Sequence, residues 1–145
     1  MIRVWTYLKN TDLHAMSAYE TLSGVMGVSF LRRLRRFQLF EFTEALPIVM
    51  QKIEGGFSVL NPTKEGYYLD RLPQVVLRDD EQVMVCQIQS GQAGRSIVWE
   101  MVVSKDVTQA QVWEQIVVSS SRVKGLLANP IYETALFLDS ANVFG

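Results

Sequence analysis

The sequence predicts an α+β protein in which two similar halves each contribute strands to an antiparallel sheet. Stretches rich in β-branched and aromatic residues alternate with stretches of helical periodicity along the 145 residues. The segments "SVLNPTKEGYYLD" and "GLLANPIYETALFLD" also end alike, with Asn-Pro, a Glu three residues after the Pro, and an apolar strand that closes on Asp. We therefore expect a degenerate tandem repeat over residues 1–72 and 81–145, the sequence form of a fused dimer. Its defining turns are Asn61-Pro62 and Asn129-Pro130.

The first half reads as strand, helix, strand, helix, strand. "IRVWTYLK" forms the first strand, and Asp12 is placed to cap the following helix, which Gly27 ends. The segment "SFLRRLRRFQLFEF" is either one long, bent strand or two short strands that meet near the arginines. A second helix starts at about Pro47, is weakened by a Gly-Gly pair and stops at Asn61-Pro62, after which "EGYYLD" forms a closing strand.

The second half replaces the first helix with a tight hairpin. "QVMVCQIQ" and "SIVWEMVV" are strands joined by the turn "SGQAGR". A helix begins at Thr108 with a capping-box pattern, and its apolar stripe continues to Leu127 before Asn-Pro ends it. "ETALFLD" then closes the chain as a strand. Trp99 on a strand and Trp113 on this helix occupy positions typical of the core.

Composition restricts the class of protein. Apolar residues make up 48% and charged residues 20% of the chain, as in ordinary globular proteins. The formal net charge of −1 argues against nucleic acid or an anionic membrane as the partner. The single cysteine, Cys86, excludes an internal disulfide framework. The sequence has neither a signal-type N-terminus nor an apolar run of the roughly 18 residues that span a bilayer. We therefore expect a cytoplasmic protein with no membrane contact.

No set of residues in the sequence has catalytic or metal-binding spacing. His14, the only histidine, has no Cys, Asp or Glu cluster at ligand spacing and is expected on the surface at a helix start. Cys86 lies in an apolar strand and is expected to serve packing. The glycines of "SGVMGVS" and "SGQAGRS" lack the Lys and Ser/Thr of a phosphate-binding loop. We therefore predict no catalytic residues, no metal and no cofactor, and a binding or assembly module.

The sharpest feature is "LRRLRR", in which Arg32, Arg33, Arg35 and Arg36 lie within five residues. Arginine side chains at this density bind phosphate groups or meet an acidic protein surface. The alternative is a solvated strand edge, where charge prevents edge-to-edge aggregation. Because side chains alternate along a strand, the four side chains cannot all lie on one face. These arginines are the candidate partner or anion contact.

Several segments together resemble PurS, the small subunit of bacterial and archaeal formylglycinamide ribonucleotide amidotransferase. The resemblance rests on Leu8-Lys9 at the end of the first strand, on Ala18 and Leu22, on the strand "LRRLRRFQLFEF", and on "LLANP" before an acidic strand. "VLNPTKE" is a second, weaker copy of that ending. The chain departs from the family where "DLHAMS" opens the first helix and where arginine pairs replace an Arg-x-Gly-Lys turn. PurS is typically about half this length and homodimeric, so the chain resembles two joined copies.

The resemblance implies a ferredoxin-like two-layer sandwich with helices on one face of the sheet. It also implies a non-catalytic subunit of phosphoribosylformylglycinamidine synthase in purine biosynthesis, which bridges the synthetase and glutaminase subunits so that ammonia passes between them. A homo-oligomer is expected as well. Two alternatives stay open: a regulatory module that holds a small anionic metabolite against the arginines, and a self-assembling protein with no enzyme partner. RNA binding is opposed by the acidic balance and by "RFQLFEF", which does not match the aromatic pattern of RNA-recognition domains.

Overall fold

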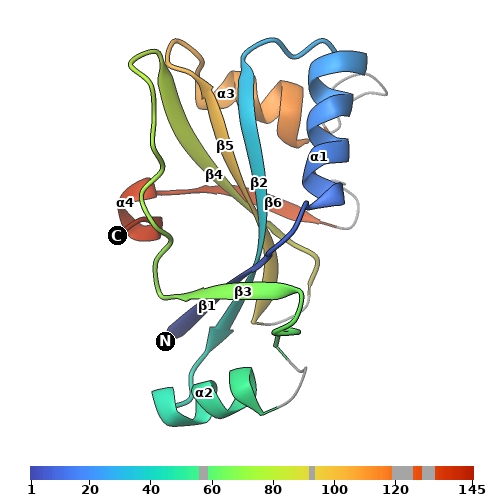
Figure 1. Ribbon diagram of the computed structural model, residues 1–145. Helices are drawn as coiled ribbons and strands as arrows, with labels where there is room; N and C mark the ends of the chain where they lie inside the picture. Colours follow the sequence, from blue (N-terminus) through green and yellow to red (C-terminus); the bar gives the residue numbers. More distant parts are fainter. Residues whose placement is uncertain (56–58, 92–93, 119–125, 129–132) are drawn as a thin grey trace.

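The computed structural model describes residues 1–55, 59–91, 94–118, 126–128 and 133–145. Within these residues the strands form one antiparallel sheet of six strands in the order β3-β1-β2-β5-β4-β6 (Figure 1). From either edge inward, the sheet has the third strand of one half, then the first, then the second. The predicted α+β class with an antiparallel sheet is confirmed. The strands are β1 (Ile2–Leu8), β2 (Leu31–Phe42), β3 (Glu65–Leu69), β4 (Glu81–Gln89), β5 (Arg95–Ser104) and β6 (Thr134–Leu138).

The helices begin and end where local sequence signals place them. Asp12 caps the first helix, because its side chain accepts hydrogen bonds from the backbone N–H groups of His14 (3.0 Å) and Ala15 (3.2 Å). Gly27 takes a φ of 67°, as expected of a glycine after a helix. Thr108 forms the predicted capping box. The helical segments are α1 (Leu13–Glu20) with the π-helical turn η1 (Thr21–Val25), α2 (Leu46–Glu54), α3 (Gln109–Val112) with the π-helical turn η2 (Trp113–Val117), and α4 (Ser140–Val143).

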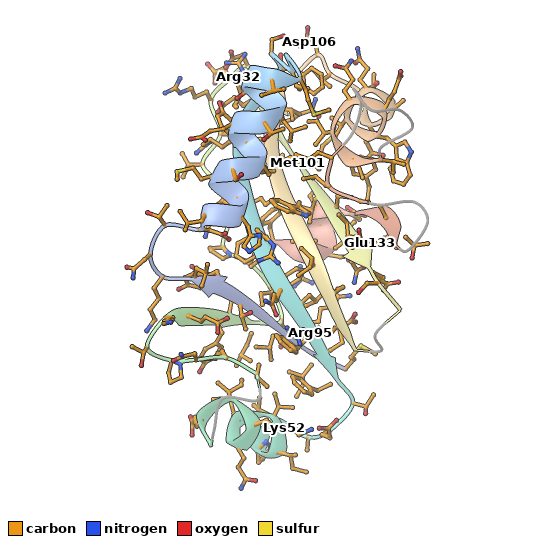
Figure 2. All side chains as sticks on the ribbon, turned by 90° about the vertical axis from the view of Figure 1, so that its right-hand side faces the viewer. Arg32, Lys52, Arg95, Met101, Asp106 and Glu133 are labelled. Atoms are coloured by element: carbon orange, nitrogen blue, oxygen red, sulfur yellow. The ribbon has the colours of Figure 1, made fainter. Side chains whose placement is uncertain are left out.

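One face of the sheet carries the main hydrophobic core. Segments α1, η1, α3 and η2 pack there against β2, β4 and β5. Alternating residues of β5 from Ile97 to Val103 point to this side, and Met101 is fully buried among them. Met101 lies inside the molecule, between the end that bears Arg32 and the end that bears Lys52 (Figure 2). Helix α2 covers a smaller patch of the same face, where its buried residues meet Phe40.

The opposite face is covered by α4 and by the segment after β3, which lies across the sheet from α1 (Figure 1). Val143 and Phe144 pack there against Trp5 and Phe37, and Leu72 forms a β-bridge with Phe144. The expectation that all helices lie on one face is therefore wrong for α4. The physical reason is that this second face is also apolar at its centre, so the chain end covers it.

The structure settles four further expectations from the sequence, two on the backbone and two on tryptophan burial. The arginine segment is one continuous strand, with a bulge between Leu31 and Arg33. The helix that begins after Thr108 does not reach Leu127, because Val118 is extended and bridges Ala128. Trp99 is buried as predicted. The core position predicted for Trp113 is wrong, since its side chain is 36% exposed at the short helix end.

The structure describes one of the two repeat-defining turns, the one at Asn61-Pro62. Asn61 forms the turn into β3: its side chain accepts from the N–H of Thr63 (3.1 Å), and its carbonyl accepts from the N–H of Glu65 (2.8 Å). Pro62 follows at the exposed corner. Asn129 and Pro130 lie outside the described residues.

Candidate functional site

Part of one edge of β2 has no partner strand among the described residues. Strand β1 pairs with β2 only from Gln38 to Phe42, and its last residues, Tyr7 and Leu8, pair with β3 alone. On its other side, β2 pairs with β5 from Leu31 to Phe40. Residues 31–37 therefore form a free strand edge on the β1 side, and this is the stretch that carries the arginines. A free edge offers backbone N–H and C=O groups to an incoming segment.

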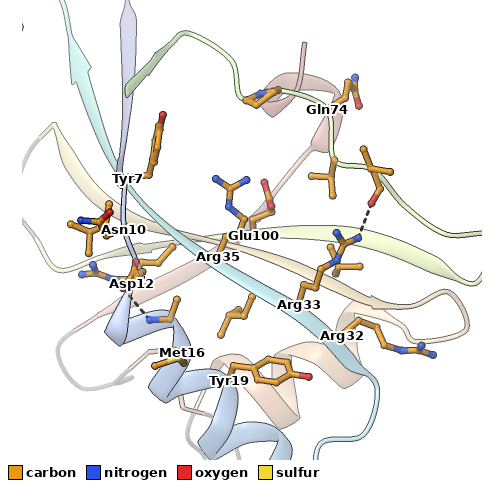
Figure 3. Close-up of a pocket in the computed structure, with 18 residues that line it drawn as sticks. Tyr7, Asn10, Asp12, Met16, Tyr19, Arg32, Arg33, Arg35, Gln74 and Glu100 are labelled. Atoms are coloured by element: carbon orange, nitrogen blue, oxygen red, sulfur yellow. Dashed lines mark hydrogen bonds between the residues drawn. The ribbon is translucent and has the colours of Figure 1, made fainter. Parts of the chain in front are cut away.

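An open groove of about 790 Å³ follows this edge, and we call it the arginine groove. Helix α1, with Met16 and Tyr19, lines one side, and residues 73–76 line the other. Figure 3 shows Arg35 and Glu100 pointing together toward the space between Tyr7 and Gln74. The structure thus brings all four predicted arginines to one groove, which is lined by Arg32, Arg33, Arg35 and Arg36.

The four arginines differ in how far the protein already uses them. Arg32 lies 3.5 Å from Asp80 in an exposed ion pair. Arg33 Nη2 donates to the carbonyl of Val76 at 2.7 Å and lies 3.4 Å from a Glu81 carboxylate oxygen. Arg35 and Arg36 make no hydrogen bond or ion pair within the described part of the chain. Those two guanidinium groups are therefore the ones available to an incoming anion.

Glu100 is the polar residue at the floor of the groove. It lies opposite Arg35 in the β2–β5 register and is only 4% exposed. Its carboxylate accepts no hydrogen bond from the described residues. Burial raises the pKa of Glu100, and the positive charges of Arg35 and Arg33 oppose part of that shift. The guanidinium groups of Arg35 and Arg33 thus favour the charged form of Glu100, and no hydrogen bond to Glu100 in the described structure fixes either of them in place.

Tyr7 forms the wall of the groove at the end of β1. Its ring stacks on Tyr68 with centroids 5.0 Å apart and meets Phe37 edge-on at 6.3 Å. It can lie across β3 because its register partner there is Gly66, which has no side chain to obstruct the ring. Arg35 lies over Phe37, 5.0 Å from the ring centroid, so the aromatic cluster also orients the free guanidinium.

Other candidate residues lie away from this groove. His14 is exposed at the start of α1. Cys86 is fully buried, and burial raises the pKa of its thiol to about 12, which leaves it protonated and unreactive. Across the residues with described positions, no three or more His, Cys, Asp or Glu side chains are placed to hold a metal ion. No described helix is long and apolar enough to cross a membrane.

Sequence reasoning missed Glu100 and Tyr7 as parts of the site. A signal for Glu100 was present, since it is the only charged residue in the apolar strand "SIVWEMVV". A charge at such a position needs a partner or a solvent-facing opening. Comparisons of the chain with protein-family models, with curated proteins and with solved structures find no match.

Proposed function

We propose that the chain is a non-catalytic bridging module that docks the acidic surface of a partner protein in the arginine groove. The observation that carries this proposal is the gathering of four arginines along a free strand edge. Two of the guanidinium groups, those of Arg35 and Arg36, have no hydrogen-bond or ion-pair partner in the described structure. Arginine is favoured at protein interfaces because its planar fork binds carboxylates in two places.

The strand order supports a tandem origin for this module. In each half the second strand lies at the centre of the sheet, the first strand next to it and the third at the edge. Two copies of a strand–helix–strand unit that shared a sheet in a dimer would give this order when fused. The fused module then has one free strand edge with arginines, where a homodimer would have two. The reason is that the second half has a hairpin where the first half has α1.

The PurS resemblance names the partners that the proposal favours. They are the synthetase and glutaminase subunits of formylglycinamide ribonucleotide amidotransferase, acting in purine biosynthesis in the cytoplasm. The module holds the two enzymes in register so that ammonia passes between them. Their docking surface is expected to carry carboxylates that face Arg35.

The test is capture of these partners from the cell's own extract on the immobilised full chain. The wild-type chain and Arg78→Glu are expected to retain both subunits, because Arg78 is exposed and does not line the groove. Arg35→Glu is expected to retain at most about a tenth as much, the loss typical of a buried interface arginine. Failure of the wild-type chain to retain either subunit, with ATP and glutamine present, would reject the bridging role.

A second candidate is a regulatory module that holds a small phosphate-bearing metabolite in the same groove. The buried Glu100 beside Arg35 favours it, because a carboxylate can accept a hydroxyl group of a ligand whose anion meets the guanidinium groups. A metabolite that binds only the folded chain adds about 2.7 kcal/mol to the free energy of unfolding at 100 times its Kd. Ribose 5-phosphate is a suitable probe, and a melting temperature unchanged up to millimolar concentrations would reject this candidate.

A further inference from the structure

A second, smaller cavity lies where β1 ends, on the sheet face that carries α1. Its volume is about 300 Å³, and it extends from the start of α1 to the first residue of β3. Thr6 and Gln38 line it from the two paired strands, Arg36 lines it from the free part of β2, and His14 lines it from α1. Because side chains alternate along β2, Arg36 and Gln38 point to the face opposite Arg35. The cavity shares Arg36 and Asp12 with the arginine groove, but it lies on the other face of β2 from Arg35 and Glu100.

Thr6 provides the observation that points to a ligand. It is 1% exposed, and its Oγ1 atom has no hydrogen-bond partner in the described structure. Buried hydroxyl groups in folded proteins are almost always paired, because an unpaired one loses its bonds to water without replacement. Thr6 lies directly opposite Gln38 in the β1–β2 register, yet the two side chains do not bond to each other. A ligand group that enters the cavity can supply the missing partner.

The neighbours of Thr6 are unused hydrogen-bond donors. Gln38 Oε1 accepts from Arg95 Nη2 at 2.8 Å, which fixes the amide orientation and leaves the two Nε2 protons free of described partners. Arg36 makes no hydrogen bond or ion pair to the described residues. A hydroxyl, an amide and a guanidinium thus line one small space. Such a donor set matches an oxyanion.

The carboxylates at the rim narrow the class of oxyanion. Asp12 uses Oδ1 to cap α1, and Glu65 uses Oε1 to accept from the N–H of Asn61 at 2.9 Å. The second oxygen of each carboxylate accepts no hydrogen bond from the described residues. Two carboxylates near one guanidinium repel a dianionic phosphate. They repel a monocarboxylate less strongly, and their free oxygens accept a hydrogen bond from a hydroxyl or ammonium group on its neighbouring carbon.

We propose that this cavity binds a small 2-hydroxy or 2-amino carboxylic acid. The ligand carboxylate accepts from Arg36, Thr6 and Gln38. Its hydroxyl or ammonium group donates to the free oxygen of Asp12 or Glu65. This function goes beyond the bridging role, because the ligand binds on the face of β2 opposite Arg35 and Glu100 and needs no partner protein.

The test is a titration of the full chain followed by two-dimensional amide NMR at constant ionic strength. The probes are sodium lactate, alanine, sodium acetate and inorganic phosphate. We expect saturable shifts at the amides of Thr6, Arg36 and Gln38 with lactate or alanine, weaker binding of acetate, and no saturable shift with phosphate. No saturation with any probe, or phosphate binding as tight as lactate binding, would overturn the proposal.

Variants separate ligand binding from folding. Thr6→Val removes the hydroxyl but keeps the shape, so it is expected to leave the ligand-free melting temperature unchanged or higher. It and Arg36→Gln are each expected to weaken lactate or alanine binding at least about tenfold. Arg78→Gln, at an exposed residue that lines neither this cavity nor the arginine groove, is the control and should bind as the wild-type chain does. Equal binding by the Thr6→Val chain would show that Thr6 is paired by an ordered water only, and the site assignment would be wrong.

Discussion

Replacement of Gly66 by alanine tests whether Tyr7 is held as rigidly as the structure indicates. A Cβ atom at position 66 would lie 2.5 Å from Tyr7 Cζ and 3.0 Å from Cε1, closer than nonbonded carbons approach. The ring would have to move, and it would then lose its stack on Tyr68 and its edge contact with Phe37. Aromatic pairs contribute about 0.5–1.5 kcal/mol each, so Gly66→Ala should lower the free energy of unfolding by about 1–3 kcal/mol.

Urea denaturation followed by tryptophan fluorescence measures this loss. With a slope of about 2 kcal/mol per molar urea, the midpoint should fall by about 1 M. Gly24→Ala is the matched control: no atom lies within 4 Å of its added Cβ, so it should be neutral or slightly stabilising. In a Tyr7→Ala background, Gly66→Ala should lower the free energy of unfolding hardly at all, because the Tyr7 ring that the added Cβ would meet is absent. An equal cost with and without Tyr7 would refute the steric argument.

Three further outcomes follow from buried side chains. Burial raises the pKa of Glu100, so the folded chain retains this proton where the unfolded chain has released it, and stability falls as pH rises through the folded pKa. Glu100→Gln should therefore be more stable than wild type at about pH 7 and lose that advantage at about pH 4, measured by urea denaturation. Met101→Ala, at a fully buried position, should lower the free energy of unfolding by about 2–5 kcal/mol. Met16→Ala, at the exposed groove wall, should change it by no more than about 0.5 kcal/mol. Cys86, with its thiol pKa raised to about 12, should react with a thiol reagent only at the rate of unfolding; a fast reaction in the folded state would contradict its burial.

The strands and helix starts could be predicted because their causes are local. The nearly continuous apolar run of β5 indicates a buried strand, and Asp12, Gly27 and Thr108 act on backbone groups a few residues away. The arginine cluster was likewise visible in sequence, and the structure brings its members to one groove.

The remaining features depend on contacts between distant residues. The early end of η2 follows from the bridge between Val118 and Ala128, which competes with a helix that the local pattern favours. The unpaired hydroxyl of Thr6 is a consequence of its register with Gln38, and no local pattern reports which residue of β2 faces β1. Glu100 joins the arginines only because β5 pairs with β2.

The most direct measurement of the proposed bridging role is isothermal titration calorimetry of the purified chain against the purified synthetase–glutaminase pair. Saturable binding is predicted for the wild-type chain and for Arg78→Glu, with affinities equal within about twofold, because Arg78 does not line the groove. Arg35→Glu should bind at least about tenfold more weakly, with a folded state verified by its melting temperature. Absence of binding by the wild-type chain, or equal affinities for the two variants, would contradict the assignment of the arginine groove as the docking site.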